Sequence, residues 1–163
     1  MLNYKAAVLR EFNDVSIEDV SCVEIPKDSV VVKVFLSGVC RSQLMEFRGG
    51  RGEDKWLPHL FGHEAVGEVL SFGSGVSKLN VKDKVILTWI GANPKNFVPP
   101  KILDINGNLI NSGKIATITQ IAIVHKDCCI KKPNGISDEV AVLFGCALGT
   151  GSGIAIKLFE KID

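Results

Sequence analysis

The sequence predicts a mainly β domain, an irregular β-barrel with short helices at one end and a further helix at the C-terminus. Two observations predict it. The first ninety residues contain short runs rich in Val, Ile and Phe that turn residues separate, a pattern typical of β-strands. After Pro133 the pattern changes to helix-start signals and helical spacing. Many short strands followed by terminal helices are typical of a barrel with helices packed against it.

Length and composition fit one folded domain, or one domain with a fragment of a second. The 163 residues are 46% apolar, enough to bury a core without disulfides. The net charge of +1 comes without a basic stripe, so no nucleic-acid partner is expected. No apolar run has membrane-spanning length, and the N-terminus lacks the apolar core of a signal peptide. Five scattered cysteines then indicate reduced thiols or metal ligands and a cytoplasmic location.

Five strands and one short helix are expected in the first ninety residues. The strand candidates are β-branched or aromatic runs bounded by turn residues. They are Tyr4–Arg10, Val15–Ile25, Ser29–Gly38, Ala65–Phe72 and Lys84–Ile90. The helix is expected at Arg41–Phe47, followed by a loop at Gly49–Phe61.

An irregular excursion is expected next, at Gly91–Lys114, where Asn, Pro and Gly accumulate. At most one small hairpin fits into it, around Ile105–Asn108. Strand character returns at Ile115–Val124 and again at Cys129–Lys131.

Two helices are expected at the C-terminus. Ser137 is a good N-cap, and the two acids after it suit a first helical turn. A second helix is expected at roughly Gly151–Ile162. The run Gly149–Gly153 invites comparison with a dinucleotide-binding loop, but it follows a helix rather than a strand, and no βαβ unit comes after it. We therefore do not expect it to bind a dinucleotide.

The strongest motif lies at residues 62–67, which read Gly-His-Glu-Ala-Val-Gly, with Gly73 and Val76 following. A His-Glu pair alone carries little information, because a lone histidine is most often a hydrogen-bonded surface or core residue. The whole stretch, however, resembles the signature G-H-E-x2-G-x5-G-x2-V of zinc-containing alcohol dehydrogenases in the medium-chain dehydrogenase/reductase family at every specified position. The flanking segments Ser37–Ser42 and Leu143–Gly151 resemble the segments that carry the family's first and third zinc ligands.

The resemblance implies a fold and a domain arrangement. Residues 1–148 would form the GroES-like, catalytic and zinc-binding domain. Residues 149–163 would begin a linker helix toward a Rossmann nucleotide-binding domain, and we expect the chain to be truncated before that domain.

Cys40, His63 and Cys146 are the three metal ligands that the resemblance implies. They follow one another at intervals of 23 and 83 residues. Two thiolates and one imidazole give Zn²⁺ three protein ligands and leave the fourth position open to a substrate oxygen. The alternative is that a cysteine is merely a small buried hydrophobe, an interpretation that we accept for the other three.

Five further residues receive roles from the resemblance. Ser42 and Glu64 would be catalytic: Ser42 would pass the alcohol proton toward solvent, and Glu64 would approach the metal and coordinate it transiently. The alternative for Glu64 is a buried carboxylate in a hydrogen bond or ion pair. Arg41 would meet the cofactor pyrophosphate, unless it is a solvated surface charge, and Thr150 would contact the nicotinamide. Trp89 would line the substrate pocket or serve as a core residue.

Three features depart from the family pattern. Gln43 stands where many relatives have an aspartate that accepts a hydrogen bond from the zinc-bound histidine. A glutamine oxygen could still accept that bond but lacks the charge, so we expect Gln43→Asp to tighten zinc binding. Met45 stands where some relatives have a histidine that completes the proton relay. Methionine cannot shuttle a proton, so any relay must go through water or be shorter. Gly91–Lys114 contains no cysteine, so one catalytic zinc and no structural zinc are expected.

The resemblance therefore predicts the zinc-binding domain of an NAD- or NADP-dependent alcohol dehydrogenase. The intact enzyme would be a homo-oligomer acting on a small-molecule alcohol or carbonyl substrate, and the isolated chain would lack turnover. One alternative is a non-catalytic GroES-like binding or assembly module, which has no use for an open zinc site. Another is a zinc-free quinone reductase relative, which the Cys-His-Cys set disfavours. About one zinc per chain would separate the first hypothesis from the module.

Overall fold

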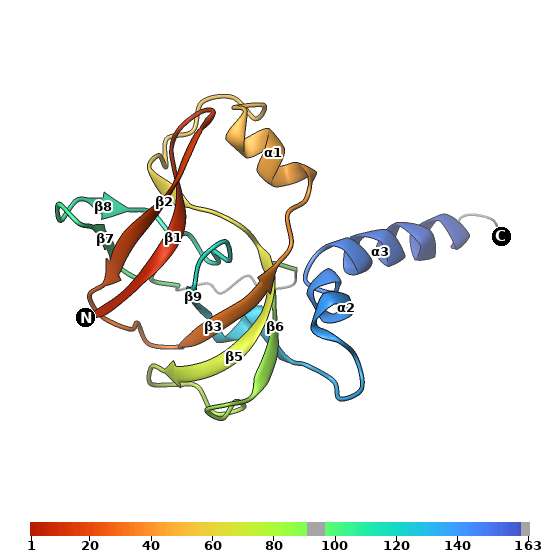
Figure 1. The fold of residues 1–163 in the computed structure, drawn as a ribbon. Coiled ribbons are helices and arrows are strands. Elements are labelled where there is room, and N and C mark those ends of the chain that lie inside the picture. Colours follow the sequence, from red (N-terminus) through yellow and green to blue (C-terminus); the bar gives the residue numbers. More distant parts are fainter. Residues whose placement is uncertain (91–96, 161–163) are drawn as a thin grey trace.

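The computed structural model describes residues 1–90 and 97–160, and in this part of the chain the strands form two five-stranded sheets (Figure 1). The strand order is β4-β1-β2-β7-β8 in the first sheet and β10-β6-β5-β3-β9 in the second, and all neighbours within a sheet are antiparallel. The first sheet comprises β1 (Leu2–Glu11), β2 (Asp14–Cys22), β4 (His59–Leu60), β7 (Ile102–Asp104) and β8 (Leu109–Ile110). The second comprises β3 (Ser29–Ser37), β5 (Glu64–Phe72), β6 (Lys84–Thr88), β9 (Ile121–His125) and β10 (Cys129–Lys131). The predicted mainly β, barrel-like fold is confirmed.

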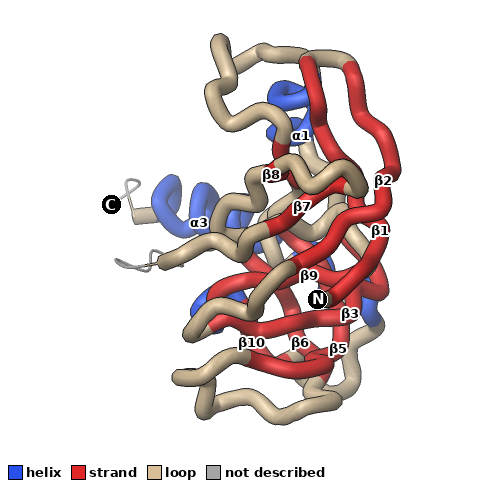
Figure 2. Tube along the Cα trace, turned by 90° about the vertical axis from the view of Figure 1, so that its left-hand side faces the viewer, coloured by secondary structure: helices blue, strands red, loops and turns tan. Residues whose placement is uncertain are grey.

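Apolar residues from both sheets meet in the core. Figure 2 shows β1, β2, β7 and β8 above β3, β5, β6 and β10. The first half of strand β3 is buried on both faces, because Val31 packs with the first sheet while Val30 and Val32 pack into a second cluster with β5 and β6. Register shifts along the β3–β5 pairing mark bulges, which bend and twist strands. They account for the irregular shape of the barrel.

The segment before β9 joins the two sheets, and here the sequence prediction is wrong. A strand was expected over Ile115–Val124, but β9 begins only at Ile121. The Ala7 N–H instead donates to Ile118 O at 2.9 Å, and the Thr117 and Ile118 N–H groups both donate to Phe61 O. The backbone groups of residues 117 and 118 thus form hydrogen bonds with two different segments of the chain. They are therefore not part of the strand pairing of β9.

The loop predictions are confirmed in part. The expected loop at Gly49–Phe61 ends in the two-residue strand β4, which pairs with β1. The expected hairpin is present, since β7 and β8 pair around the turn at Ile105–Asn108. Residues 91–96 of the Gly91–Lys114 excursion lie outside the described residues.

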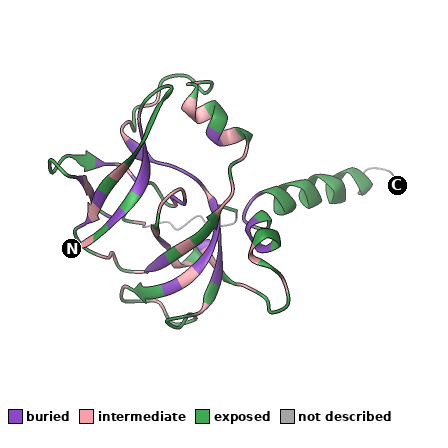
Figure 3. Ribbon diagram, viewed as in Figure 1, coloured by how far each residue is buried: buried purple, intermediate pink, exposed green. Residues whose placement is uncertain are grey.

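The helices position two segments of the candidate site. Helix α1 (Arg41–Phe47) has the predicted bounds, and Ser137 caps α2 (Asp138–Leu143) as expected. Helix α3 (Ala147–Phe159) begins four residues before the predicted Gly151, although glycines disfavour helix. Every residue of α3 is exposed, and the helix projects from the barrel (Figure 3). None of the helices in residues 1–90 and 97–160 has the length and apolar character that a membrane span requires.

Candidate metal centre

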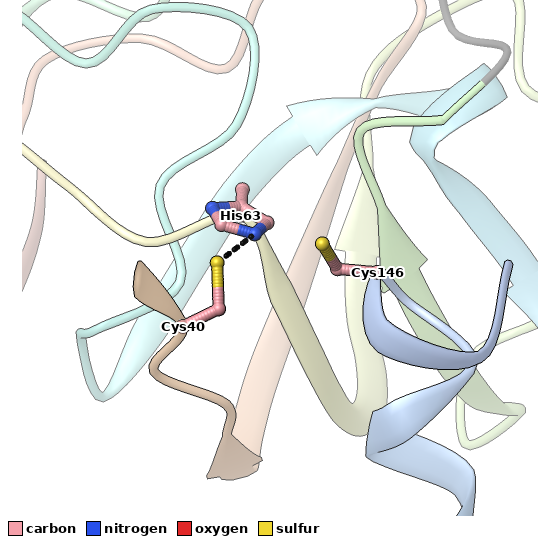
Figure 4. Close-up of side chains that lie close together, drawn as sticks. All are labelled: Cys40, His63 and Cys146. Carbon is pink, nitrogen blue, oxygen red and sulfur yellow. Dashed lines mark hydrogen bonds between the residues drawn. The ribbon is translucent and has the colours of Figure 1, made fainter. Parts of the chain in front are cut away.

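Three side chains from separate parts of the fold converge beside the barrel. Cys40 precedes α1, His63 directly precedes β5, and Cys146 precedes α3. The two sulfurs and a ring nitrogen of His63 all lie within 4.8 Å of one another (Figure 4). Within residues 1–90 and 97–160, this is the group of His, Cys and acidic side chains that could hold a metal ion.

The geometry of this group fits zinc. Cys40 Sγ and His63 Nε2 are 3.5 Å apart. With Zn–S and Zn–N bonds of about 2.3 and 2.0–2.1 Å, a tetrahedral ion would separate the two atoms by about 3.5 Å. The donor set and the Cys40–His63 spacing therefore both suit Zn²⁺, and three protein ligands leave one of its four tetrahedral positions to another group.

Glu64 is hydrogen-bonded both to the segment that leads to Cys40 and to the segment that contains Cys146. Its backbone oxygen accepts from the Gly38 N–H at 3.1 Å and from Ser37 Oγ at 3.0 Å, on the segment that leads to Cys40. Its buried carboxylate accepts hydrogen bonds from the backbone N–H groups of Cys146 and Ala147. These bonds satisfy donors at the start of α3 and explain why that helix begins early.

Two glycines make room for Glu64. A Cβ added to Gly38 would lie 2.5 Å from Glu64 Cδ, and one added to Gly145 would lie 2.6 Å from Glu64 Cβ and 2.5 Å from Leu87 O. Each cysteine segment therefore carries a glycine because the Glu64 side chain fills the space between them. Burial raises the pKa of Glu64, and its two backbone hydrogen bonds oppose that rise. Its carboxylate faces backbone and is not among the three converging groups.

Gln43 lies buried behind His63. Its Oε1 accepts from the Cys40 N–H at 2.9 Å, and its Nε2 is hydrogen-bonded to His63 Nδ1. The amide oxygen that could have accepted from a zinc-bound His63 is thus held by the Cys40 backbone in this structure. Burial, and then the charge of Arg51, lower the pKa of His63. Both effects favour the neutral ring that a metal ligand requires.

The other predicted residues occupy different positions. Ser42 Oγ is 3.0 Å from Cys40 Sγ, and Thr150 Oγ1 is 4.0 Å from Cys146 Sγ. Trp89 follows β6, is 51% exposed, and meets the His63 ring edge to face with 6.2 Å between centroids. It is therefore not a core residue. Arg41 is exposed at the first position of α1.

A cavity of about 1090 Å³ adjoins the converging groups. Ser42, Trp89 and Thr150 line it together with the three candidate ligands, whereas Arg41 does not. One aromatic ring and two hydroxyl-bearing side chains thus line the same cavity as the three candidate ligands.

A charged group on the same cavity is not apparent from the sequence. The buried His59 ring lies with Nε2 3.1 Å from Asp54 Oδ2 and 3.9 Å from Glu46 Oε1, while Nδ1 is 2.9 Å from Leu60 O. Burial raises the pKa of Glu46, and the charges of His59 and Arg51 oppose this. A histidine within an apolar run is the one sequence signal here, and it does not reveal these partners.

The fold and the Cys-His-Cys group together define a β-barrel domain with a candidate metal site. Residues 26–134 match the family of alcohol dehydrogenase GroES-like domains, and this chain belongs to that family. The resemblance inferred from the signature at residues 62–76 is thereby confirmed.

Several relatives share this domain. Sorbitol dehydrogenase of Bacillus subtilis is 35% identical over 85 residues, covering 51% of the chain and 24% of the relative. Alcohol dehydrogenase B of Mycobacterium tuberculosis is 26% identical over 178 residues, which covers 94% of this chain and 47% of the relative.

Solved structures show the same fold. The alcohol dehydrogenase zinc-binding domain protein of Burkholderia ambifaria superposes with a TM-score of 0.81 at 24% identity, covering 93% of this chain and 48% of that one. Benzyl alcohol dehydrogenase of Acinetobacter calcoaceticus superposes with a TM-score of 0.77 at 23% sequence identity. The match covers 96% of this chain and 48% of that one. Where a match covers most of the chain, the chain thus spans about half the length of the relative.

Proposed function

We propose that this chain is the metal-binding domain of a zinc-dependent alcohol dehydrogenase. The observation that carries the proposal is the convergence of Cys40, His63 and Cys146, at a spacing that suits zinc, on a cavity of substrate size. Zinc held there would polarise the oxygen of an alcohol or carbonyl substrate. A nicotinamide cofactor, NAD or NADP, would accept or supply the hydride in the intact enzyme, as the family resemblance implies.

The chain's own residues would hold the substrate and move its proton. Ser42 lines the cavity beside Cys40 Sγ, so its hydroxyl can take the substrate proton and pass it to water. Met45 is exposed and its thioether carries no transferable proton, so the relay beyond Ser42 runs through water. The Trp89 ring forms a wall of the substrate pocket.

The remaining roles concern the dinucleotide and the metal. Thr150 lines the cavity and would contact the nicotinamide, while the exposed Arg41 would bind the pyrophosphate. Glu64 is 3% exposed, and its Oε2 makes no hydrogen bond to the described residues, which leaves that oxygen available for transient metal coordination.

The wider assignments are also proposals. Residues 1–148 would be the catalytic domain and 149–163 the start of the linker helix. The substrate would be a small alcohol or carbonyl compound, in keeping with the alcohol dehydrogenases among the relatives. The intact enzyme would be a homo-oligomer. All five cysteines are free, which supports a cytoplasmic location.

Metal analysis of the purified chain tests the proposal. We expect about one zinc per chain in the wild type, loss of zinc in Cys40→Ser, and full retention in Cys129→Ser, whose residue is absent from the converging group. We also expect no NAD(P)H-dependent turnover. A chain that binds no zinc would favour the alternative of a non-catalytic GroES-like module, and turnover would refute the expected inactivity of the isolated domain.

A further inference from the structure

The side-chain amide of Gln43 has an oxygen that accepts hydrogen bonds and an NH₂ group that donates them. The hydrogen-bond partner of the oxygen is a group that can only donate. The backbone N–H of Cys40 only donates, and it points at Gln43 Oε1 at 2.9 Å. Reversing the amide would set two donors against each other. Gln43 is 3% exposed, so no solvent is at hand to relieve that conflict. Its NH₂ end must therefore face His63.

This orientation selects one tautomer of His63. Gln43 Nε2 donates to His63 Nδ1, and a nitrogen that accepts a hydrogen bond carries no proton. The single proton of the neutral ring then lies on Nε2, which is 3.5 Å from Cys40 Sγ, a possible acceptor. We infer that Gln43 is a positioning residue that holds the His63 proton on the nitrogen that would bind the metal.

The consequence for the metal rests on the proposed function. Zinc on Nε2 needs the neutral ring to carry its proton on Nδ1, where a hydrogen-bond acceptor should stand. In this chain a donor stands there. A metal held on Nε2 would therefore require the proton to move from Nε2 to Nδ1 and one of the two Gln43 hydrogen bonds to break or reverse.

Gln43→Glu isolates this effect. A glutamate has nearly the same shape but accepts at both ends, so it can keep the Cys40 N–H bond and also accept from His63 Nδ1–H. We expect about tenfold or greater tightening of zinc, the scale typical of changes in the partner of a metal-bound histidine. Gln43→Asp supplies the same acceptor with a shorter reach and serves as a second variant. Gln120→Glu adds the same charge at an exposed glutamine that accepts from the Lys5 N–H, and it is the matched control.

The experiment combines nitrogen NMR of the His63 ring in the metal-free chain with zinc titration against a chelator. We expect the proton on Nε2 in the wild type and in Gln120→Glu, and on Nδ1 in Gln43→Glu or Gln43→Asp, with tighter zinc only in the latter two. A proton on Nδ1 in the wild type overturns the inference, whether or not a variant folds. An Nδ1 that stays unprotonated in the acidic variants also overturns it. If the tautomers shift as expected but no form binds zinc, the proposed function fails while the role of Gln43 stands.

Discussion

Gly145→Ala probes the packing that places Cys146. The added methyl would lie 2.5 Å from Leu87 O and 2.6 Å from Glu64 Cβ, so the groups must separate by about 0.9 Å to reach an ordinary 3.4 Å contact. The Thr88 hydroxyl also holds Gly145 O at 2.6 Å, which restricts how far this residue can retreat. Overpacking of this kind costs about 1–3 kcal/mol. Cys146 follows Gly145 directly, so a shift of this backbone displaces a candidate ligand, and we expect zinc binding to weaken as well.

Thermal unfolding and zinc titration measure the two effects. For a chain of this size, about 1–3 kcal/mol corresponds to a fall in Tm of about 2–12 °C. The control is Gly151→Ala on the exposed helix α3, where an added Cβ meets nothing within 4 Å and helix propensity favours alanine by up to about 1 kcal/mol. Its Tm should stay equal or rise, and its zinc affinity should not change. A Gly145→Ala protein with wild-type Tm and zinc affinity would show that the space at Gly145 does not position Cys146.

Three further predictions follow from other contacts. Glu64→Ala removes the acceptor of the Cys146 and Ala147 N–H groups, so zinc affinity measured by calorimetry should fall about tenfold or more; unchanged affinity would exclude an organising role. Hydrogen bonds, the Asn108 N–H first, lower the Asp104 pKa to about 2, so its contribution to hairpin stability is complete above pH 3.8 and lost as pH falls toward 2. Amide exchange of the hairpin should show this loss, and Asp104→Asn should abolish it. Zinc should alter Trp89 fluorescence because its ring abuts His63; a full response persisting in Trp89→Phe would contradict this.

Local patterns in the sequence predict the parts of the fold that depend on neighbouring residues. The bounds of α1 and the Ser137 cap of α2 follow from such signals, and both are confirmed. The signature motif also indicates His63 as a candidate ligand. The glycine-containing segments on either side of the motif indicate Cys40 and Cys146. The structure shows why those glycines are needed, since Glu64 fills the space beside them.

Features that depend on distant partners could not be predicted. Helix α3 begins at Ala147 because Glu64, from another part of the chain, binds its first N–H groups. Periodicity suggests a strand at residues 115–120, but hydrogen bonds to Phe61 and β1 use that backbone instead. The orientation of the Gln43 amide is a third case. It is set by the Cys40 N–H, a backbone partner that the residue type at position 43 does not reveal.

X-ray absorption at the zinc edge of the zinc-loaded chain tests the central claim most directly. A Cys40–His63–Cys146 site predicts two sulfur atoms at about 2.3 Å and a histidine nitrogen at about 2.0–2.1 Å, with one further light atom at the open position. Cys146→Ser should reduce the sulfur count to one. Zinc surrounded only by oxygen and nitrogen, or by four sulfurs, would contradict the assignment of these three residues as the metal ligands.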